Sequence, residues 1–120
     1  MKIVIDFKFT TLNEYIKIER SPNKWGYIKA NNVKSEQTDI IKYFCKGKTW
    51  MSYPCKIKFT WHVKDKRKDL DNIAFAKKFI LDGLVKAGTL KNDNLNHITG
   101  FSDEVVFDDK EYVELEISEV

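Results

Sequence analysis

The sequence lacks several features that mark specialised classes of protein. It has only two cysteines, Cys45 and Cys55, without the close spacing of a zinc site or enough partners for a disulfide framework. No apolar run approaches the roughly 18 residues of a membrane span. The start does not resemble a signal peptide, and there is no internal repeat or low-complexity segment. We therefore expect a cytoplasmic protein with reduced, buried thiols and no membrane association.

Composition indicates one folded domain over residues 1–120. Hydrophobic residues make up 42% of the chain and aromatic residues 13%, which is enough to build a core. The formal charge of +3 alone is a weak argument for a nucleic-acid partner. The distribution of charge is more informative, because many Lys and Arg precede Asp69 whereas the tail after Ser102 is acidic.

The first half of the chain predicts a strand, a connection and a helix. Apolar residues alternate with polar ones over residues 3–9, as in a half-buried strand. Residues 10–24 read as a connection with a turn at Ser-Pro-Asn. Trp25-Gly26-Tyr27 follows, and this aromatic pair could stack on bases or form a loop that covers the core, which is the commoner arrangement. A helix is expected over residues 33–46.

Turn and cap residues support that helix and the strand after it. Asn31 or Asn32 could cap the helix, and Gly47 could end it. Residues 55–63 alternate between apolar residues and a largely basic face, which predicts a second strand. His62 lies on the basic face and could contact DNA or a phosphate, but a partly exposed histidine without a catalytic role is the commoner case.

A longer helix should follow Asp71 and end at Gly88. At about 100° per residue, its core stripe holds Ile73, Ala76, Ile80, Leu84 and Ala87. Lys78 shares a face with Asp71, whereas Lys77 points toward the edge of the stripe. Further apolar positions suggest burial on more than one side, and a second subunit is one candidate for the contacting surface.

The last third predicts a short strand from His97 to about Phe101, a polar connection over 103–110, and a final strand at 112–117. The expected order is βαβαββ. We therefore expect an α+β domain with two helices against one mixed sheet.

The stretch from Lys64 to Asp93 carries the candidate chemistry. Asp69 and Asp71, two residues apart before a helix, can both direct carboxylates at one hard cation such as Mg²⁺. Asp93 could complete the cluster from the loop after the helix. Lys78 could offset charge on a phosphoryl transition state. The upstream cations would meet DNA phosphates, and these are Lys64, Lys66, Arg67 and Lys68.

A structural reading of the same residues stays open. Aspartates just before a helix are also what N-capping and the helix dipole favour. Lysine runs are commonly solvated surface. Spacing alone therefore does not separate a metal site from a helix cap.

Three motifs in order resemble the RusA-type Holliday junction resolvases. They are Lys68-Asp69-Leu70-Asp71-Asn72-Ile73, then the run from Lys78 to Gly88, and then Asn92-Asp93. The closing Tyr112 to Ile117 is similar to that family's last strand. The chain departs from the family pattern at Asn92, where a second aspartate is often found, and by about three added residues between Asp71 and Lys78.

The resemblance implies a small homodimeric, Mg²⁺-dependent endonuclease of DNA recombination and repair, of a type often encoded by phages and prophages. Such an enzyme nicks four-way DNA junctions symmetrically. The metal-binding carboxylates carry over to Asp69, Asp71 and Asp93, and the essential lysine to Lys78. Two alternatives remain: a metal-dependent nuclease for other branched DNA, and a non-enzymatic DNA-binding phage module.

Overall fold

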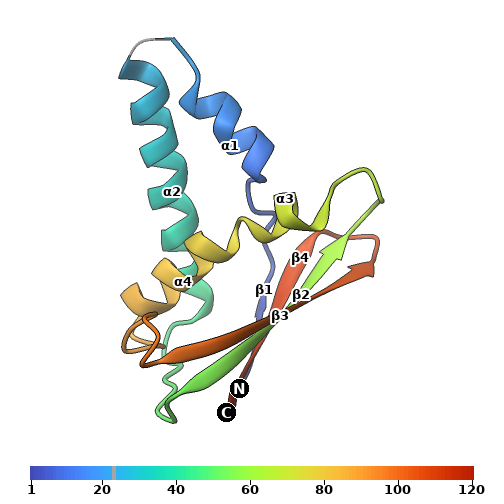
Figure 1. The fold of residues 1–120 in the computed structure, drawn as a ribbon. Coiled ribbons are helices and arrows are strands. Elements are labelled where there is room, and N and C mark those ends of the chain that lie inside the picture. Colours follow the sequence, from blue (N-terminus) through green and yellow to red (C-terminus); the bar gives the residue numbers. More distant parts are fainter. Residues whose placement is uncertain (23) are drawn as a thin grey trace.

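The computed structural model describes residues 1–22 and 24–120 (Figure 1). Four strands and four helices are present in this part of the chain. In chain order they are β1 (Lys2–Ile5), α1 (Leu12–Glu19), α2 (Lys24–Phe44), β2 (Cys55–Val63), α3 (Leu70–Ala74), α4 (Lys77–Lys86), β3 (Ile98–Phe107) and β4 (Tyr112–Glu119).

The strands form one mixed sheet in the order β1-β4-β2-β3. β2 runs parallel to β3, and the other neighbouring pairs are antiparallel. In the register, Phe59 of β2 lies between Leu115 of β4 and Asp103 of β3. The expectation of a mixed sheet in an α+β domain is confirmed.

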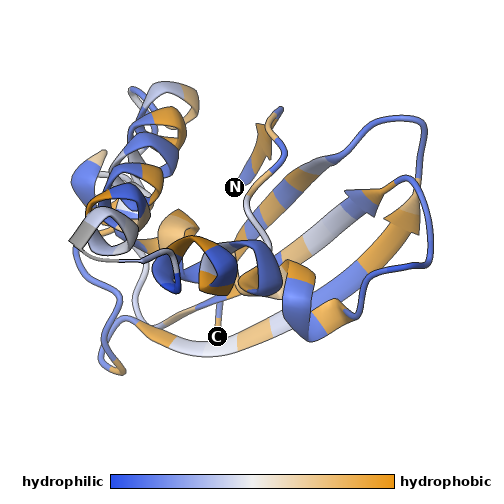
Figure 2. Cartoon of the chain, turned by 90° about the horizontal axis from the view of Figure 1, so that it is seen from above, coloured by the Kyte–Doolittle hydropathy of each residue, from blue (hydrophilic) through white to orange (hydrophobic). Residues whose placement is uncertain are grey.

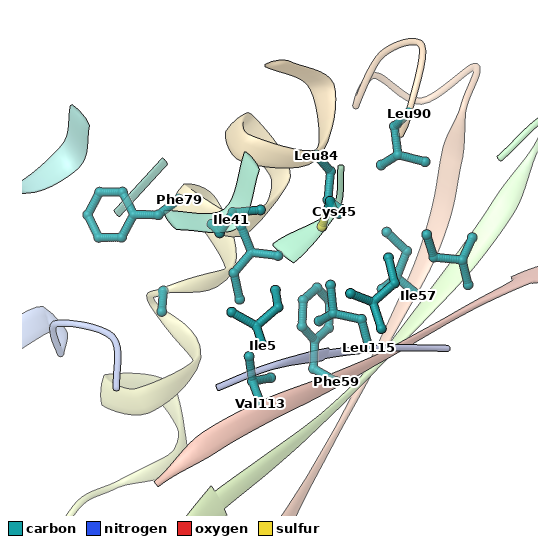
Figure 3. Close-up of a cluster of buried hydrophobic side chains, with 14 of the residues drawn as sticks. Ile5, Ile41, Cys45, Ile57, Phe59, Phe79, Leu84, Leu90, Val113 and Leu115 are labelled. Carbon is teal, nitrogen blue, oxygen red and sulfur yellow. The ribbon is translucent and has the colours of Figure 1, made fainter. Parts of the chain in front are cut away.

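The helices cover one face of this sheet, and the core lies between them (Figure 3). From the strands, Ile5, Ile57, Phe59 and Leu115 are almost fully buried, and from the helices Ile41, Phe79 and Leu84 meet them. Alternating hydrophobic and hydrophilic bands along the strands in Figure 2 reflect the period of two that places one face inward. This period explains why the alternating residues 55–63 were correctly predicted as a strand.

Two further predictions are confirmed by local geometry. Gly47 and Gly88 follow α2 and α4 with φ of 77° and 78°, a region that favours glycine at helix ends. Cys45 and Cys55 are free and buried. Burial raises the pKa of the Cys45 thiol to about 11, so the thiol is protonated and inert near neutral pH.

The helical part between β1 and β2 differs from the prediction. Residues 12–19, expected as connection, form α1, and α2 begins at Lys24 instead of near residue 33. α1 starts at a capping box in which the Thr11 side chain accepts from Glu14 N and the Glu14 side chain accepts from Thr11 N. Asn31 and Asn32 lie inside α2 and are not its cap. The predicted turn at Ser-Pro-Asn includes Asn23, which lies outside the described residues.

Three other boundaries were wrong. The strand expected over residues 3–9 ends at Ile5. The helix expected from Asp71 to Gly88 is divided into α3 and α4 at Phe75–Ala76, where Ala76 N donates to Ile73 O and Lys78 N to Phe75 O. These i to i−3 bonds tighten the turn beyond a regular α-helix. β3 runs to Phe107, so most of the expected polar connection is an edge strand.

Within residues 1–22 and 24–120, no helix combines the length and apolar character needed to cross a bilayer.

Candidate metal and nucleic-acid site

Asp69 and Asp71 lie at the start of α3, and both are exposed. Asp69 occupies the N-cap position with extended backbone, yet its side chain makes no capping hydrogen bond. Asp71 Oδ1 accepts only the neighbouring backbone N–H of Asn72, at 3.0 Å. The cap explanation therefore does not account for the Asp69 carboxylate, which leaves its oxygens available for a cation.

The segment that holds these aspartates is tied to the first helix. Asn72 Oδ1 accepts a hydrogen bond from Asn13 N at 2.8 Å, which joins α3 to the start of α1. Leu12 of α1 and Asp71 of α3 line one open depression of about 590 Å³. Asp103 of β3 lines it too, so residues distant in sequence converge beside Asp71.

Asp103 belongs to a polar network that the sequence reasoning missed. Its Oδ2 lies 2.8 Å from Lys77 Nζ, and its Oδ1 accepts from Trp61 Nε1 at 2.9 Å. Lys77 Nζ also lies about 5 Å from the ring centroids of Phe59 and Phe101. A sequence signal for this network does exist. One strand face holds Phe101, Asp103, Val105 and Phe107, so Asp103 is a single charge among apolar residues. An inward-pointing charge also suits an edge strand.

Lys77 and Lys78 have different surroundings. Lys77 is half-buried against β2 and β3, whereas Lys78 is exposed on α4. The helical angle that grouped Lys78 with Asp71 assumed one regular helix, and the tightened turn at Phe75–Ala76 breaks that assumption. Exposure nevertheless leaves the Lys78 ammonium free to meet a substrate.

Asp93 lies in the loop after α4, at the far end of that helix from Asp71 (Figure 1). α4 has ten residues, which corresponds to about 15 Å. Asp93 is exposed, and its backbone N donates to Asn92 Oδ1 at 2.7 Å. Across residues 1–22 and 24–120, no three His, Cys, Asp or Glu side chains are grouped so that they could hold a metal ion. A single chain therefore does not gather Asp69, Asp71 and Asp93 into one cluster.

The predicted DNA-contacting cations lie in the loop between β2 and α3. Lys64, Lys66 and Arg67 are exposed, and Lys68 is half-buried. Lys66 Nζ lies 5.2 Å from the Phe107 ring centroid, and Arg67 Nε lies 3.5 Å from Asp65. This arrangement places a basic loop directly before the two aspartates.

That loop borders an open groove of about 530 Å³, to which other segments also contribute charges. Lys8, after β1, pairs with Glu111 at 3.3 Å, and a hydrogen bond to Glu111 raises the pKa of Lys8. Lys110 pairs with Asp6 at 2.6 Å. The groove is thus of mixed charge. Its other lining residues are Lys64, Asp65, Lys68 and Asp109.

His62 differs from the partly exposed histidine that was expected, because it is only 8% exposed. Its ring stacks on Tyr112 with centroids 3.9 Å apart. Nδ1 lies 3.1 Å from Asp108, and Nε2 lies 3.0 Å from Glu114 but outside hydrogen-bonding geometry. The backbone N–H of Asp109 and then His62 lower the pKa of Asp108. These contacts explain His62 as a structural link between β2 and the β3–β4 turn.

Comparison with known proteins adds no family assignment. Neither the protein-family models nor the curated proteins give a match to this chain. The resemblance to RusA-type resolvases therefore depends on the motifs themselves.

Proposed function

We propose that this chain is a Mg²⁺-dependent endodeoxyribonuclease that resolves four-way DNA junctions by paired symmetric nicks as a homodimer. The observation that carries the proposal is the Asp69 carboxylate, which stands at the N-cap of α3 without capping it. Asp71 lies beside it, and the basic loop over residues 64–68 precedes both. A carboxylate at the N-cap that makes no capping hydrogen bond, next to exposed cations, favours a metal-dependent site over a helix cap.

The donor set suits Mg²⁺. This ion prefers oxygen ligands and is commonly held by one or two carboxylates, with water and substrate phosphates completing its shell. Asp69 and Asp71 would supply those carboxylates from one chain. When bound, Mg²⁺ would polarise the phosphodiester and stabilise the leaving oxygen.

The remaining candidate residues act on the DNA itself. Lys64, Lys66 and Arg67 are exposed on the loop and would neutralise backbone phosphates, with Lys68 closest to the aspartates in sequence. Lys78 would offset the negative charge that develops on the phosphoryl group in the transition state. Together they hold and orient the strand at the two carboxylates.

The proposed homodimer also gives Asp93 a role. A four-way junction offers two equivalent strands, and a twofold dimer offers two equivalent sites. Asp71 and Asp93 lie beyond opposite ends of α4. In the proposed dimer, a second copy would bring its own Asp93 to the first copy's Asp69 and Asp71. Each site would then contain residues of both subunits.

One cleavage experiment tests the proposed function against two other functions. Nicking of a synthetic four-way junction, a fork and a linear duplex, each with and without Mg²⁺, separates a junction resolvase from a nuclease for other branched DNA. Salt-sensitive binding without cleavage of any substrate would instead support a non-enzymatic DNA-binding module.

A further inference from the structure

We propose that the free end of the α1–α2 hairpin is a second DNA-contacting surface that recognises unpaired bases. This hairpin tip consists of Arg20, the C-cap of α1, and Trp25 to Lys29 of α2. In Figure 1 the hairpin extends away from the sheet, so its tip is the most distant part of the helical layer. The inference rests on the proposed function in taking DNA as the substrate, and it assigns DNA contact to a surface well separated from the aspartates.

The charge of this segment has one sign. From Arg20 to Ser35 the sequence holds four cations and no Asp or Glu, although 18 acidic residues occur in the whole chain. Arg20 and Lys29 are exposed at the tip. Lys34 reaches Asp82 of α4 at 3.7 Å and therefore belongs to the base of the hairpin. A polyanion is the partner that such a surface complements.

Large aromatic side chains are exposed among these cations. Trp25 is 61% exposed and Tyr27 is 72% exposed. The adjacent Ile28 is exposed as well. The expectation that Trp25-Gly26-Tyr27 covers the core is therefore wrong. Most other aromatic residues of the chain pack on the core. Exposed ring faces next to cations are what proteins use to stack on unpaired bases.

Gly26 fixes this arrangement. A Cβ at Gly26 would lie 2.7 Å from the carbonyl oxygens of Glu19 and Ser21, at the end of α1. The absence of a side chain therefore lets α2 pack directly on α1 at this point. Because Gly26 faces α1, its neighbours Trp25 and Tyr27 are turned outward.

The angular spread of the rings favours DNA over a lipid surface. Two residues apart in a helix, Trp25 and Tyr27 point about 200° from each other, so one flat bilayer cannot take up both. Asn31 and Asn32 are also exposed along the same helix. Stacking involves one ring and one base at a time, and a helix end with rings on two sides can enter an opening between strands.

The length of α1 separates the tip from the depression that Asp71 lines. α1 begins at Leu12, which lines the depression shared with Asp71, and its eight residues rise about 12 Å. At about 3.4 Å per nucleotide, this corresponds to three or four nucleotides. The tip would therefore meet bases opened near a branch point while the aspartates face the strand to be cut.

The test uses the double variant Trp25→Ala/Tyr27→Ala, with Tyr43→Ala as control. Tyr43 is 76% exposed at the opposite end of α2. Binding to a four-way junction, a duplex with an internal unpaired bubble and an intact duplex is measured by fluorescence anisotropy in EDTA, so cleavage does not interfere. We expect the double variant to bind junction and bubble about five- to fifty-fold more weakly, with duplex binding and the control unchanged.

A second variant keeps the test independent of the rings. Lys29→Ala should weaken binding to all three DNAs and reduce the slope of log affinity against log salt by about one. Thermal melting by circular dichroism checks that each variant is folded. Unchanged junction and bubble binding by the double variant would overturn the tip proposal while leaving the nuclease proposal intact.

Other outcomes separate the two proposals. If the wild-type chain binds none of the DNAs, the proposed function fails and the tip proposal fails with it. If the double variant instead loses binding only to phosphatidylserine vesicles, the tip is a lipid-binding surface and the DNA assignment is wrong.

Discussion

Lys77 Nζ lies 2.8 Å from Asp103 Oδ2 and joins α4 to the inward face of the edge strand β3. Both side chains are mostly buried, with 18% and 22% exposure. The adjacent Lys78 is exposed and makes no comparable contact with the sheet. The two neighbouring lysines therefore have separable roles. Lys77 holds α4 against the sheet, and Lys78 is available to a substrate.

Lys77→Met should reduce stability, whereas Lys78→Met should reduce activity. Losing Lys77 leaves the Asp103 carboxylate partly buried without its cation, so we expect a loss of about 1–3 kcal/mol in the free energy of unfolding. Lys78→Met should change stability by less than about 0.5 kcal/mol but greatly reduce junction nicking. Urea unfolding and nicking assays on both variants measure this contrast. Full activity of a stable Lys78→Met variant would exclude Lys78 from the site.

The α2–α4 contact should be sensitive at Gly83. A Cβ there would lie 2.6 Å from Cβ and Cγ2 of Ile41, which is itself fully buried. Gly83→Ala should therefore destabilise the domain by about 1–3 kcal/mol. Gly100→Ala is the control, because its Cβ would meet only the flexible Lys56 side chain, at 3.4 Å. If Ile41→Ala is added and the two losses sum fully, the clash is not the cause.

Stability should fall in acid partly through Glu14. Partial burial raises the pKa of this carboxyl, but hydrogen bonds from Thr11 and the charges of Lys68 and Lys8 together outweigh it, so the pKa is lowered in the folded chain. A lowered carboxyl pKa contributes stability above the unfolded pKa, and this contribution is lost as pH falls through the folded value. Glu14→Gln should therefore reduce the loss of stability between about pH 6 and pH 3, measured by urea unfolding. Glu36→Gln is the control, because it removes the same charge from an exposed position on α2. It should leave the loss of stability in acid unchanged.

Mixed dimers test whether Asp93 acts on the other subunit. If each site combines Asp71 of one copy with Asp93 of the other, a dimer of Asp71→Asn and Asp93→Asn chains contains one intact site. Mixing the two inactive variants should then restore nicking of one junction strand. No restored activity, with mixed dimers demonstrated by differently tagged chains, would place all the ligands within one chain. Nicking by the Asp93→Asn variant alone would remove Asp93 from the site.

Residue pattern alone gave much of the sheet. Alternation placed β2 correctly over Cys55–Val63, and Gly47 and Gly88 mark the ends of α2 and α4, because both signals are local. α1 was missed although its capping box at Thr11 and Glu14 is visible in the sequence, since the nearby Ser-Pro-Asn suggested a turn.

Other features depend on contacts between distant segments. The Phe75–Ala76 break contains neither Gly nor Pro, so no local signal marks it. The second half of β3 was predicted as a polar connection because Asp103 and Glu104 read as polar, whereas Lys77 and Trp61 satisfy Asp103 on the inner face. The separation of Asp71 from Asp93 likewise follows from how α3 and α4 are placed, which spacing alone could not give.

Nicking of a four-way junction by the Asp71→Asn variant tests the central proposal most directly. Asn keeps the size of the side chain and removes the charge that would hold Mg²⁺. The variant should bind the junction in EDTA as tightly as the wild-type chain, yet nick neither strand in Mg²⁺ while the wild-type chain nicks both. Wild-type nicking by a folded Asp71→Asn variant would contradict the proposed metal site.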